Sequence, residues 1–466
     1  MCSVWREEGL QIRRRPFRDR LVIGEMKMEE FIKILTDQIR CAKARDGVAR
    51  ELSSHILDQA QAYEQSGMAH DKAVTKAVRE MGDPVEIGVL MDRIHRPQFN
   101  WRMLLVTFVL SVMGMLCLIP VYGVERGCRQ GLFMLAGFAV IAAVYFVDYS
   151  VIGRISAAAY LVMTIVLFIG RYCMATVNGR IPVMSILVYL YVPVFAGILY
   201  QLRMGGCRAV GEAIAVSVIT FVLCTYFSST LPASFNILLI MIIMVFAAIQ
   251  KGVFGKGRKR MTAVAAAAVL LPSAAFLGYL IAGGAGFRVM RIKAFFQRDQ
   301  YRDTYNYIYT VIDDILRNAR FVGRGGSEMD SMQYVTFTGA EGLVPLAAMH
   351  VYGFIAGILL VAAMIALVLH AVKIVRGQKN QLGFLVSMGC MLVLLLNCLE
   401  GILVNVGLFP ATTVVIPFLT YGGGAAFVYA VLIGLLLSVH RYEKVYARET
   451  YACKPRWKVD LKIEKR

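Results

Sequence analysis

The sequence predicts an all-α, polytopic membrane protein with about ten transmembrane helices and a small cytoplasmic helical bundle at its N-terminus. Of its 466 residues, 58% are hydrophobic, whereas soluble globular chains contain about 45–50%. The excess is concentrated in residues 101–440, in repeated apolar runs of about 20 residues, the length at which a helix crosses the hydrocarbon core. These runs are too long and continuous for barrel strands, so helices are the expected way to satisfy the backbone in lipid.

The first hundred residues are polar and divide into two segments. Residues 1–27 contain five arginines between positions 13 and 20 and no apolar core, which predicts a basic disordered arm or an assigned start that lies too far upstream. Residues 28–98 are expected to form a cytoplasmic helical domain, because apolar residues recur there at helical spacing. One expected helix ends at Met81-Gly82-Asp83-Pro84, where Gly terminates the helix and Pro prevents its continuation. The apolar positions are Phe31, Ile32, Ile34, Leu35 and Ile39, then Val48, Leu52, Ile56 and Ala60, then Ala73, Val74, Ala77 and Val78.

Ten membrane spans are expected in residues 101–440. Basic residues collect in alternate short loops and in the tail 441–466, so the positive-inside rule predicts that both termini are cytoplasmic. The net charge of +19 is therefore attributed to membrane topology and anionic lipid, and no nucleic-acid partner is expected. The spans are expected near 103–123, 131–148, 155–172, 183–201, 209–228, 233–250, 261–283, 343–370, 383–404 and 418–438.

A long polar segment, residues 284–342, interrupts this pattern and is expected to be a large extracellular loop. A connector of this length in a compact protein is usually functional or disordered. Its basic residues include Arg288, Arg291 and Lys293, and the apolar spacing from Ile308 to Ile315 predicts an amphipathic helix at the membrane interface. The outer loops are therefore the expected place for chemistry.

The most specific motif lies before the last span. It reads Gly407-Leu408-Phe409-Pro410, followed by Ile416-Pro417-Phe418-Leu419-Thr420-Tyr421-Gly422-Gly423. Prolines fix the backbone of such a stretch and glycines permit close approach, so a formed outer turn is expected. This stretch resembles the G-L-L-P … L-P-F-x-S-Y-G-G signature of the FtsW/RodA/SpoVE family, also called SEDS proteins.

Weaker resemblances extend the similarity to most of the chain. Asn178-Gly179-Arg180 resembles an N-G-A-R-R-W turn of that family, and Arg291-Ile292-Lys293 resembles the run that opens its large outer loop. Gly323-Arg324-Gly325 resembles a later G-x-G element. Residues 28–98 resemble a small helical prefix domain that precedes some Gram-positive membrane proteins.

The resemblance implies a peptidoglycan glycosyltransferase that polymerises lipid II, or a related undecaprenyl-linked substrate, outside the cytoplasmic membrane. It also implies a class B penicillin-binding protein and other divisome or elongasome proteins as partners, in division, elongation or sporulation. The family has an aspartate at the start of the eighth span as acid/base candidate. In this chain Gly342 occupies the corresponding position and Glu341 is its neighbour. We therefore keep three alternatives: Glu341 substitutes for the aspartate, the chain is a catalytically impaired scaffold, or it is a lipid-linked precursor flippase.

The predicted site combines a carboxylate with basic and polar groups for a lipid-linked pyrophosphate. Glu341 is the catalytic candidate. Glu400, a carboxylate within a span beside Asn397, is a functional candidate because a charge in lipid is costly. No cofactor or metal site is expected, although a divalent cation could assist. The substrate-binding candidates are Arg288, Arg291, Lys293, Asn178, Arg180, Asn405, Pro417, Tyr421, Gly422 and Gly423.

Overall fold

A computed structural model describes residues 26–175, 181–228, 231–281, 290, 293–301, 307–326, 341–410 and 415–445; positions 121, 271–281, 299 and 341 are described for their backbone alone. The described residues form helices and the turns between them, and they divide into two compact units, residues 26–98 with 444–445, and the described part of residues 99–443. The all-α prediction is confirmed for the described part of the chain.

The N-terminal unit consists of α2 (Met28–Asp37), α3 (Ala42–Gln65), α4 (His70–Met81) and α5 (Pro84–Ile94). Its core contains most of the apolar positions that the sequence spacing singled out, including Phe31, Leu35 and Ile56. α4 ends at the predicted place, with Gly82 at φ +90°. α5 begins directly afterwards because Asp83 caps it, accepting a hydrogen bond from the Val85 N–H at 2.8 Å.

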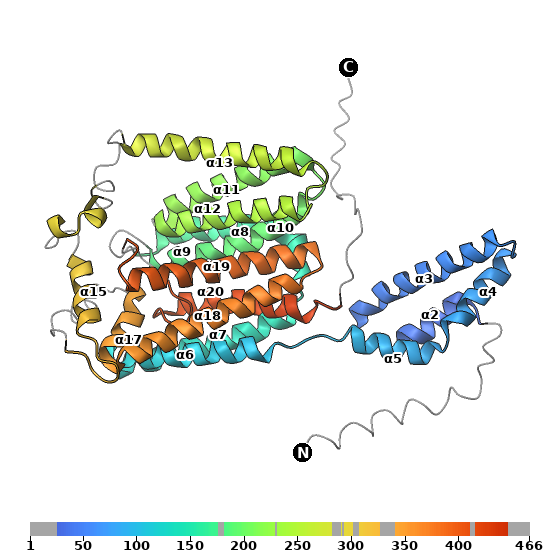
Figure 1. The fold of residues 1–466 in the computed structure, drawn as a ribbon, viewed down its shortest axis with the longest axis horizontal. Coiled ribbons are helices and arrows are strands. Elements are labelled where there is room, and N and C mark those ends of the chain that lie inside the picture. Colours follow the sequence, from blue (N-terminus) through green and yellow to red (C-terminus); the bar gives the residue numbers. More distant parts are fainter. Residues whose placement is uncertain are drawn as a thin grey trace, which may run out of the picture. The chain divides into compact units, whose positions relative to one another are not determined.

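The second unit is a bundle of long apolar helices that lie side by side (Figure 1). Among the described residues, nine helices are long and apolar enough to cross a membrane, which agrees with a multi-pass membrane protein. They are α6 (Trp101–Tyr122), α7 (Val124–Phe146), α8 (Ser150–Cys173), the combined α9 (Pro182–Leu187), η2 (Val188–Leu190) and α10 (Tyr191–Gln201), α11 (Gly206–Ser228), α12 (Leu231–Gln250), α18 (Phe354–Gly377), α19 (Gln381–Asn405) and α20 (Gly423–Arg441).

The expected seventh span, 261–283, coincides with α13 (Arg258–Ile281), whose side chains are described only as far as residue 270. α13 is therefore a continuous helix at the predicted place, and the count of nine rests on the residues that are described with their side chains.

The eighth span differs from the prediction. The expected helix over 343–370 is divided by Gly353 into α17 (Val344–Tyr352) and α18, and Gly353 adopts φ +97° and ψ 170°. This conformation is essentially restricted to glycine, so the chain turns between the two helices although its hydropathy is continuous. The membrane span begins only at Phe354.

Three elements complete one end of the bundle. They are α15 (Tyr307–Arg317), η4 (Glu341–Leu343) and α17, and α15 and α17 are visible together at that end in Figure 1. We call this end, which also contains the C-terminus of α19 and residues 415–422, the site end.

Candidate functional site

The chain around the predicted acid/base position is attached to the end of α19 by Asn405. The Asn405 side chain is buried; its Oδ1 accepts a hydrogen bond from the Leu346 N–H at 3.0 Å. Its Nδ2 donates to the Gly342 carbonyl at 2.7 Å and to the Gly401 carbonyl at 2.8 Å. Asn405 therefore caps the first turn of α17 from outside the helix and fixes Gly342 against α19.

A second contact joins α17 to α6. Pro120 lies inside α6 and has no N–H, so the Leu116 carbonyl lacks its usual helical donor. The Tyr352 hydroxyl donates to this carbonyl at 2.9 Å. A proline in one helix thus provides the acceptor that holds the last residue of the neighbouring short helix.

Residues 318–326, which we call the capping loop, surround the break between α17 and α18. The Gly323 and Gly325 N–H groups donate to the carbonyls of Tyr352 and His350 at 3.0 and 2.8 Å. In the other direction the Phe354 N–H donates to the Arg320 carbonyl at 2.8 Å. The loop therefore satisfies backbone groups at the end of one helix and at the start of the next. This gives the predicted G-x-G element a structural role.

α15 covers α17 with its apolar face. Its buried side chains include Val311, Ile312 and Ile315, while Asp313 is exposed. The sequence predicted an amphipathic helix here, and the helix is confirmed. Its apolar face packs against another helix, because α17 lies directly beside it.

Arg298 connects the segment before α15 to the C-terminus of α19. Its Nη2 donates to the Gly407 carbonyl, and its guanidinium lies 5.0 Å from the Phe295 ring centroid and 4.7 Å from the Tyr309 ring centroid. A cation is favourable at a helix C-terminus, where the carbonyl dipoles converge. Arg298 therefore links the segment before α15, α15 itself and the C-terminus of α19 through one side chain.

The proline- and glycine-containing motif forms a packed turn, as predicted. The Gly422 N–H donates to Gln130 Oε1 at 2.9 Å, and the Ile416 N–H donates to Thr420 Oγ1 at 2.8 Å. Gln130 is completely buried on α7. The turn is therefore fixed from inside by its own threonine and from outside by one glutamine.

The predicted residues of this turn differ in their surroundings. Pro417 is buried, and Tyr421 is half-buried, with its ring centroid 6.4 Å from that of Tyr122 and 6.3 Å from that of Phe133. Gly422 and Gly423 are half-buried at the start of α20. Of the four predicted site residues in this turn, Tyr421 and the two glycines thus retain exposed surface.

A polar network extends from the turn into the bundle. The Tyr429 hydroxyl on α20 donates to the Val415 carbonyl and accepts from Asn397 Nδ2 at 3.0 Å. Further along α19, Glu400 Oε2 accepts from Asn236 Nδ2 at 2.6 Å. The intramembrane carboxylate is therefore hydrogen-bonded to a neighbouring helix, as expected for polar groups in lipid.

Several predicted site residues cannot be placed. Asn178, Arg180, Arg288 and Arg291 lie outside the described residues, and Glu341 is described for its backbone alone. Lys293 is exposed. The site end therefore brings together Gly342, Asn405 and the 415–422 turn, and the substrate roles of all these residues stay predictions.

Sequence reasoning did not select Gln130 or His350 for the site. His350 is buried next to the capping loop, and burial lowers its pKa below the ordinary value; Arg324 adds to this effect and Asp314 opposes it. Gln130 could have been found as a polar residue in an apolar run, but its partner lies about 290 positions away in the sequence.

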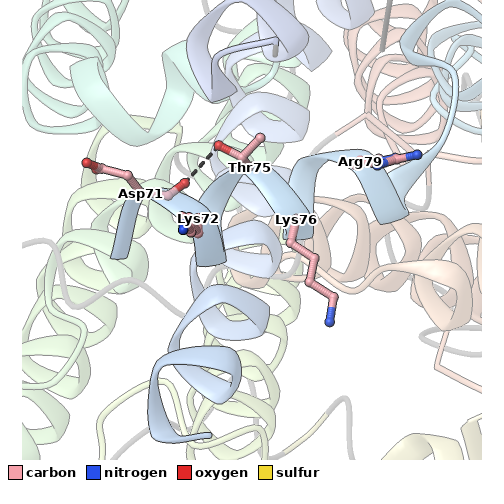
Figure 2. A pocket seen from close by; sticks show the side chains of 5 residues that line it. All are labelled: Asp71, Lys72, Thr75, Lys76 and Arg79. Carbon is pink, nitrogen blue, oxygen red and sulfur yellow. Dashed lines mark hydrogen bonds between the residues drawn. The ribbon is translucent and has the colours of Figure 1, made fainter. Parts of the chain in front are cut away.

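The N-terminal unit has a surface hollow along α4 (Figure 2). The Thr75 hydroxyl donates to the Asp71 carbonyl at 2.8 Å, a bond within the helix. One side of a single helix provides all of the lining, so this hollow is an open face of α4. The lining residues are Asp71, Lys72, Thr75, Lys76 and Arg79.

Comparison with known proteins identifies relatives of the membrane unit. The FTSW_RODA_SPOVE family model, described as "Cell cycle protein", matches residues 100–445. Stage V sporulation protein E of Bacillus subtilis (strain 168) is 32% identical over 92 residues, covering 20% of this chain and 25% of that protein. A probable peptidoglycan glycosyltransferase FtsW of Trichlorobacter lovleyi is 25% identical over 210 residues, covering 44% of this chain and 51% of that protein. The chain thus spans between a quarter and about half of the length of these relatives.

A solved structure shares the fold. It comes from work titled "Structural coordination of polymerization and crosslinking by a peptidoglycan synthase complex", with a TM-score of 0.58 and 16% identity. The similarity covers 74% of this chain and 98% of that one. At this identity the similarity establishes the arrangement of the helices.

Proposed function

Because the chain belongs to the FtsW/RodA/SpoVE family, we propose that it is a peptidoglycan glycosyltransferase that polymerises lipid II at the outer face of the cytoplasmic membrane. Glycosyl transfer needs a base for the acceptor hydroxyl and positive charge for the leaving pyrophosphate. The site end is the part of the molecule that supports this chemistry best. The process served by the enzyme would be cell division, elongation or sporulation.

One observation carries the proposal: Asn405 fixes Gly342, and with it the backbone next to Glu341, against the helix that leads into the signature turn. The names of the relatives agree, since one is a probable peptidoglycan glycosyltransferase and another is a sporulation protein. A lipid-linked sugar that reaches this end would meet the turn and the η4 segment together.

The position of the carboxylate differs from the family pattern. A glycine occupies the position where the family has its aspartate, so Glu341 would have to act from the neighbouring position with its longer side chain. The same substitution favours a second candidate, a catalytically impaired family member that acts as a scaffold for its partner.

The proposal includes an orientation and partners. Basic residues in the 251–260 and 373–379 loops lie at the bundle end opposite the site end, which supports cytoplasmic termini. A class B penicillin-binding protein is the proposed partner, alongside other divisome or elongasome proteins. A divalent cation would assist by neutralising negative charge on the leaving pyrophosphate.

The test is polymerisation of labelled lipid II by purified protein, alone and with a class B penicillin-binding protein. We expect Glu341→Ala to abolish chain formation. Glu125→Ala is the matched control, because Glu125 is an exposed carboxylate at the start of α7 that pairs with Arg129. Gly342→Asp restores the family residue at its expected position.

The outcomes separate the candidates. Loss of activity in Glu341→Ala, with Glu125→Ala active, supports Glu341 as the base. An inactive wild type that gains activity in Gly342→Asp supports the scaffold. Wild-type activity that is unaffected by Glu341→Ala contradicts the role of Glu341, and lipid II translocation without polymerisation contradicts the enzyme in favour of a flippase.

A further inference from the structure

The outer face of α5 carries apolar side chains that the N-terminal unit does not cover. Val89, Leu90 and Ile94 are 40%, 49% and 54% exposed, and they lie on one side of the helix with Arg93. Side chains of this size are normally buried in a domain, and a cluster of them on one helix face indicates an interaction surface.

The opposite face of α5 is fixed to α2, so the apolar face cannot turn inward. A Cβ at Gly88 would lie 2.6 Å from the Leu35 carbonyl oxygen, which shows how closely the two helices approach. The buried carboxylate of Asp92 accepts from the Arg40 N–H at 2.8 Å and pairs with its guanidinium at 3.4 Å. The exposed face is thus the side of α5 that remains for a partner.

The short connection between α5 and the first span limits how far the end of α5 can lie from the membrane surface. Phe99 and Trp101, with ring centroids 4.4 Å apart, begin the first span, and Phe99 also contacts Tyr145 at 5.3 Å. Such aromatic clusters mark the lipid headgroup level. Ile94 precedes Phe99 by five positions, so an extended chain holds the end of α5 within about 18 Å of that level.

The charges on this stretch have the sign that anionic lipid attracts. At the C-terminal end of α5 and in the segment that follows it, the exposed charged side chains are Arg93, Arg96 and Arg102, whereas the exposed carboxylates of Asp83 and Glu86 lie at the start of the helix. Asp92, the acidic residue next to Arg93, is buried and paired with Arg40. Basic residues interleaved with apolar ones are typical of helices that lie in the membrane interface.

We propose that the exposed face of α5, formed by Val89, Leu90, Arg93 and Ile94, binds the surface of an anionic bilayer and holds the N-terminal unit against the membrane. The helix would lie along the surface, with its apolar side chains at the boundary between headgroups and acyl chains and its arginine at the phosphates. This interaction does not depend on the proposed enzymatic function.

The experiment uses the full chain with Trp5, Trp101 and Trp457 replaced by Phe. One variant adds Leu90→Trp, and the matched control adds Leu57→Trp at an α3 leucine that is 46% exposed. Both are reconstituted in vesicles of phosphatidylcholine and phosphatidylglycerol whose acyl chains are brominated near the headgroup, so that bromine quenches any indole that reaches the interface.

We expect at least about two-fold quenching at position 90, because interfacial helices bury their apolar face ~5–10 Å deep, and little at position 57. Quenching at position 90 should fall in phosphatidylcholine alone, and also when Arg93→Gln and Arg96→Gln are added. In the wild-type chain, α5 amides should exchange hydrogen more slowly in the anionic vesicles than in phosphatidylcholine.

The absence of quenching at position 90 in anionic vesicles, or equal quenching at both positions, overturns the proposal. Unchanged amide exchange in α5 does the same without any substitution. Either result would indicate that the exposed face of α5 binds a protein partner, because these vesicles contain lipid as the binding surface and the face would not have bound it.

Discussion

Replacing Asn405 by alanine tests whether the site end is held together by one buried side chain. The substitution removes three hydrogen bonds, to the Leu346 N–H and to the carbonyls of Gly342 and Gly401. The Gly401 carbonyl also lies within α19, whereas the other two groups lose a partner that no helix replaces. An unsatisfied buried backbone group costs about 1–3 kcal/mol, so we expect the two groups together to lose about 2–6 kcal/mol.

The assay is thermal unfolding in detergent, followed with a thiol-reactive dye. The dye reports unfolding because the membrane unit contains buried cysteines, Cys117, Cys224, Cys390 and Cys398. Val406→Ala is the matched control, since this neighbouring side chain is 46% exposed. Asn405→Ala should lower the midpoint clearly and Val406→Ala should leave it close to that of the wild type.

The result also separates two roles of Asn405. If the residue is a clamp, stability and polymerisation fall together. If it contacts substrate, as the sequence predicted, the KM for lipid II should rise while the unfolding midpoint stays unchanged. Equal midpoints for Asn405→Ala and Val406→Ala would refute the clamp.

Three further predictions concern the same end of the molecule. Gly353→Ala should lower the free energy of unfolding by about 1–3 kcal/mol or more, because Gly353 has a positive φ and an added Cβ would lie 2.7 Å from the backbone of the capping loop. The measurement is thermal unfolding, and Gly211→Ala is the control because a Cβ at Gly211 meets no neighbouring atom. Arg298→Ala should speed amide hydrogen exchange in α15, because the substitution removes a hydrogen bond at the C-terminus of α19 and two contacts with aromatic rings, worth about 2 kcal/mol together. Lys293→Ala, at an exposed side chain, is the control and should leave the exchange unchanged. Because the pKa of His350 is lowered in the folded protein, the unfolded chain binds a proton at this residue more readily. The contribution of His350 to stability should therefore be complete above pH 6.5 and decline as the pH falls below that value. Melting curves at pH 5–8 should show a smaller decline for His350→Gln.

The membrane helices could be predicted because length and hydropathy determine them directly. The division of the eighth span could not, since α17 and α18 are both apolar and the break depends on the φ of Gly353 and on hydrogen bonds to the capping loop. Hydropathy averages over such a position. The sequence did contain one signal, a glycine followed by a new apolar run. Glycines are frequent inside membrane helices, so this signal alone does not indicate a break.

The site could be predicted in part for a similar reason. The turn at 415–422 was evident from its prolines and glycines, but Gln130, which fixes it, comes from the second span. A partner so distant in sequence leaves no local pattern. Asn405 was selected as a polar residue near a span end, yet its bonds to Gly342 and Leu346 depend on how α17 folds back onto α19.

α19 is the element to which both halves of the site end are attached. Asn405 holds the η4 segment, and Asn397, through Tyr429 and the Val415 carbonyl, holds the start of the turn. Eight residues separate the two asparagines, which is about 12 Å along a helix. Asn405 holds the η4 segment directly and Asn397 reaches the turn through Tyr429 of α20, so we expect a shift of α19 to displace the segment and the turn together. The turn is also held by Gln130 of α7 and by Tyr429 of α20, so its position relative to the η4 segment depends on α7, α19 and α20 together.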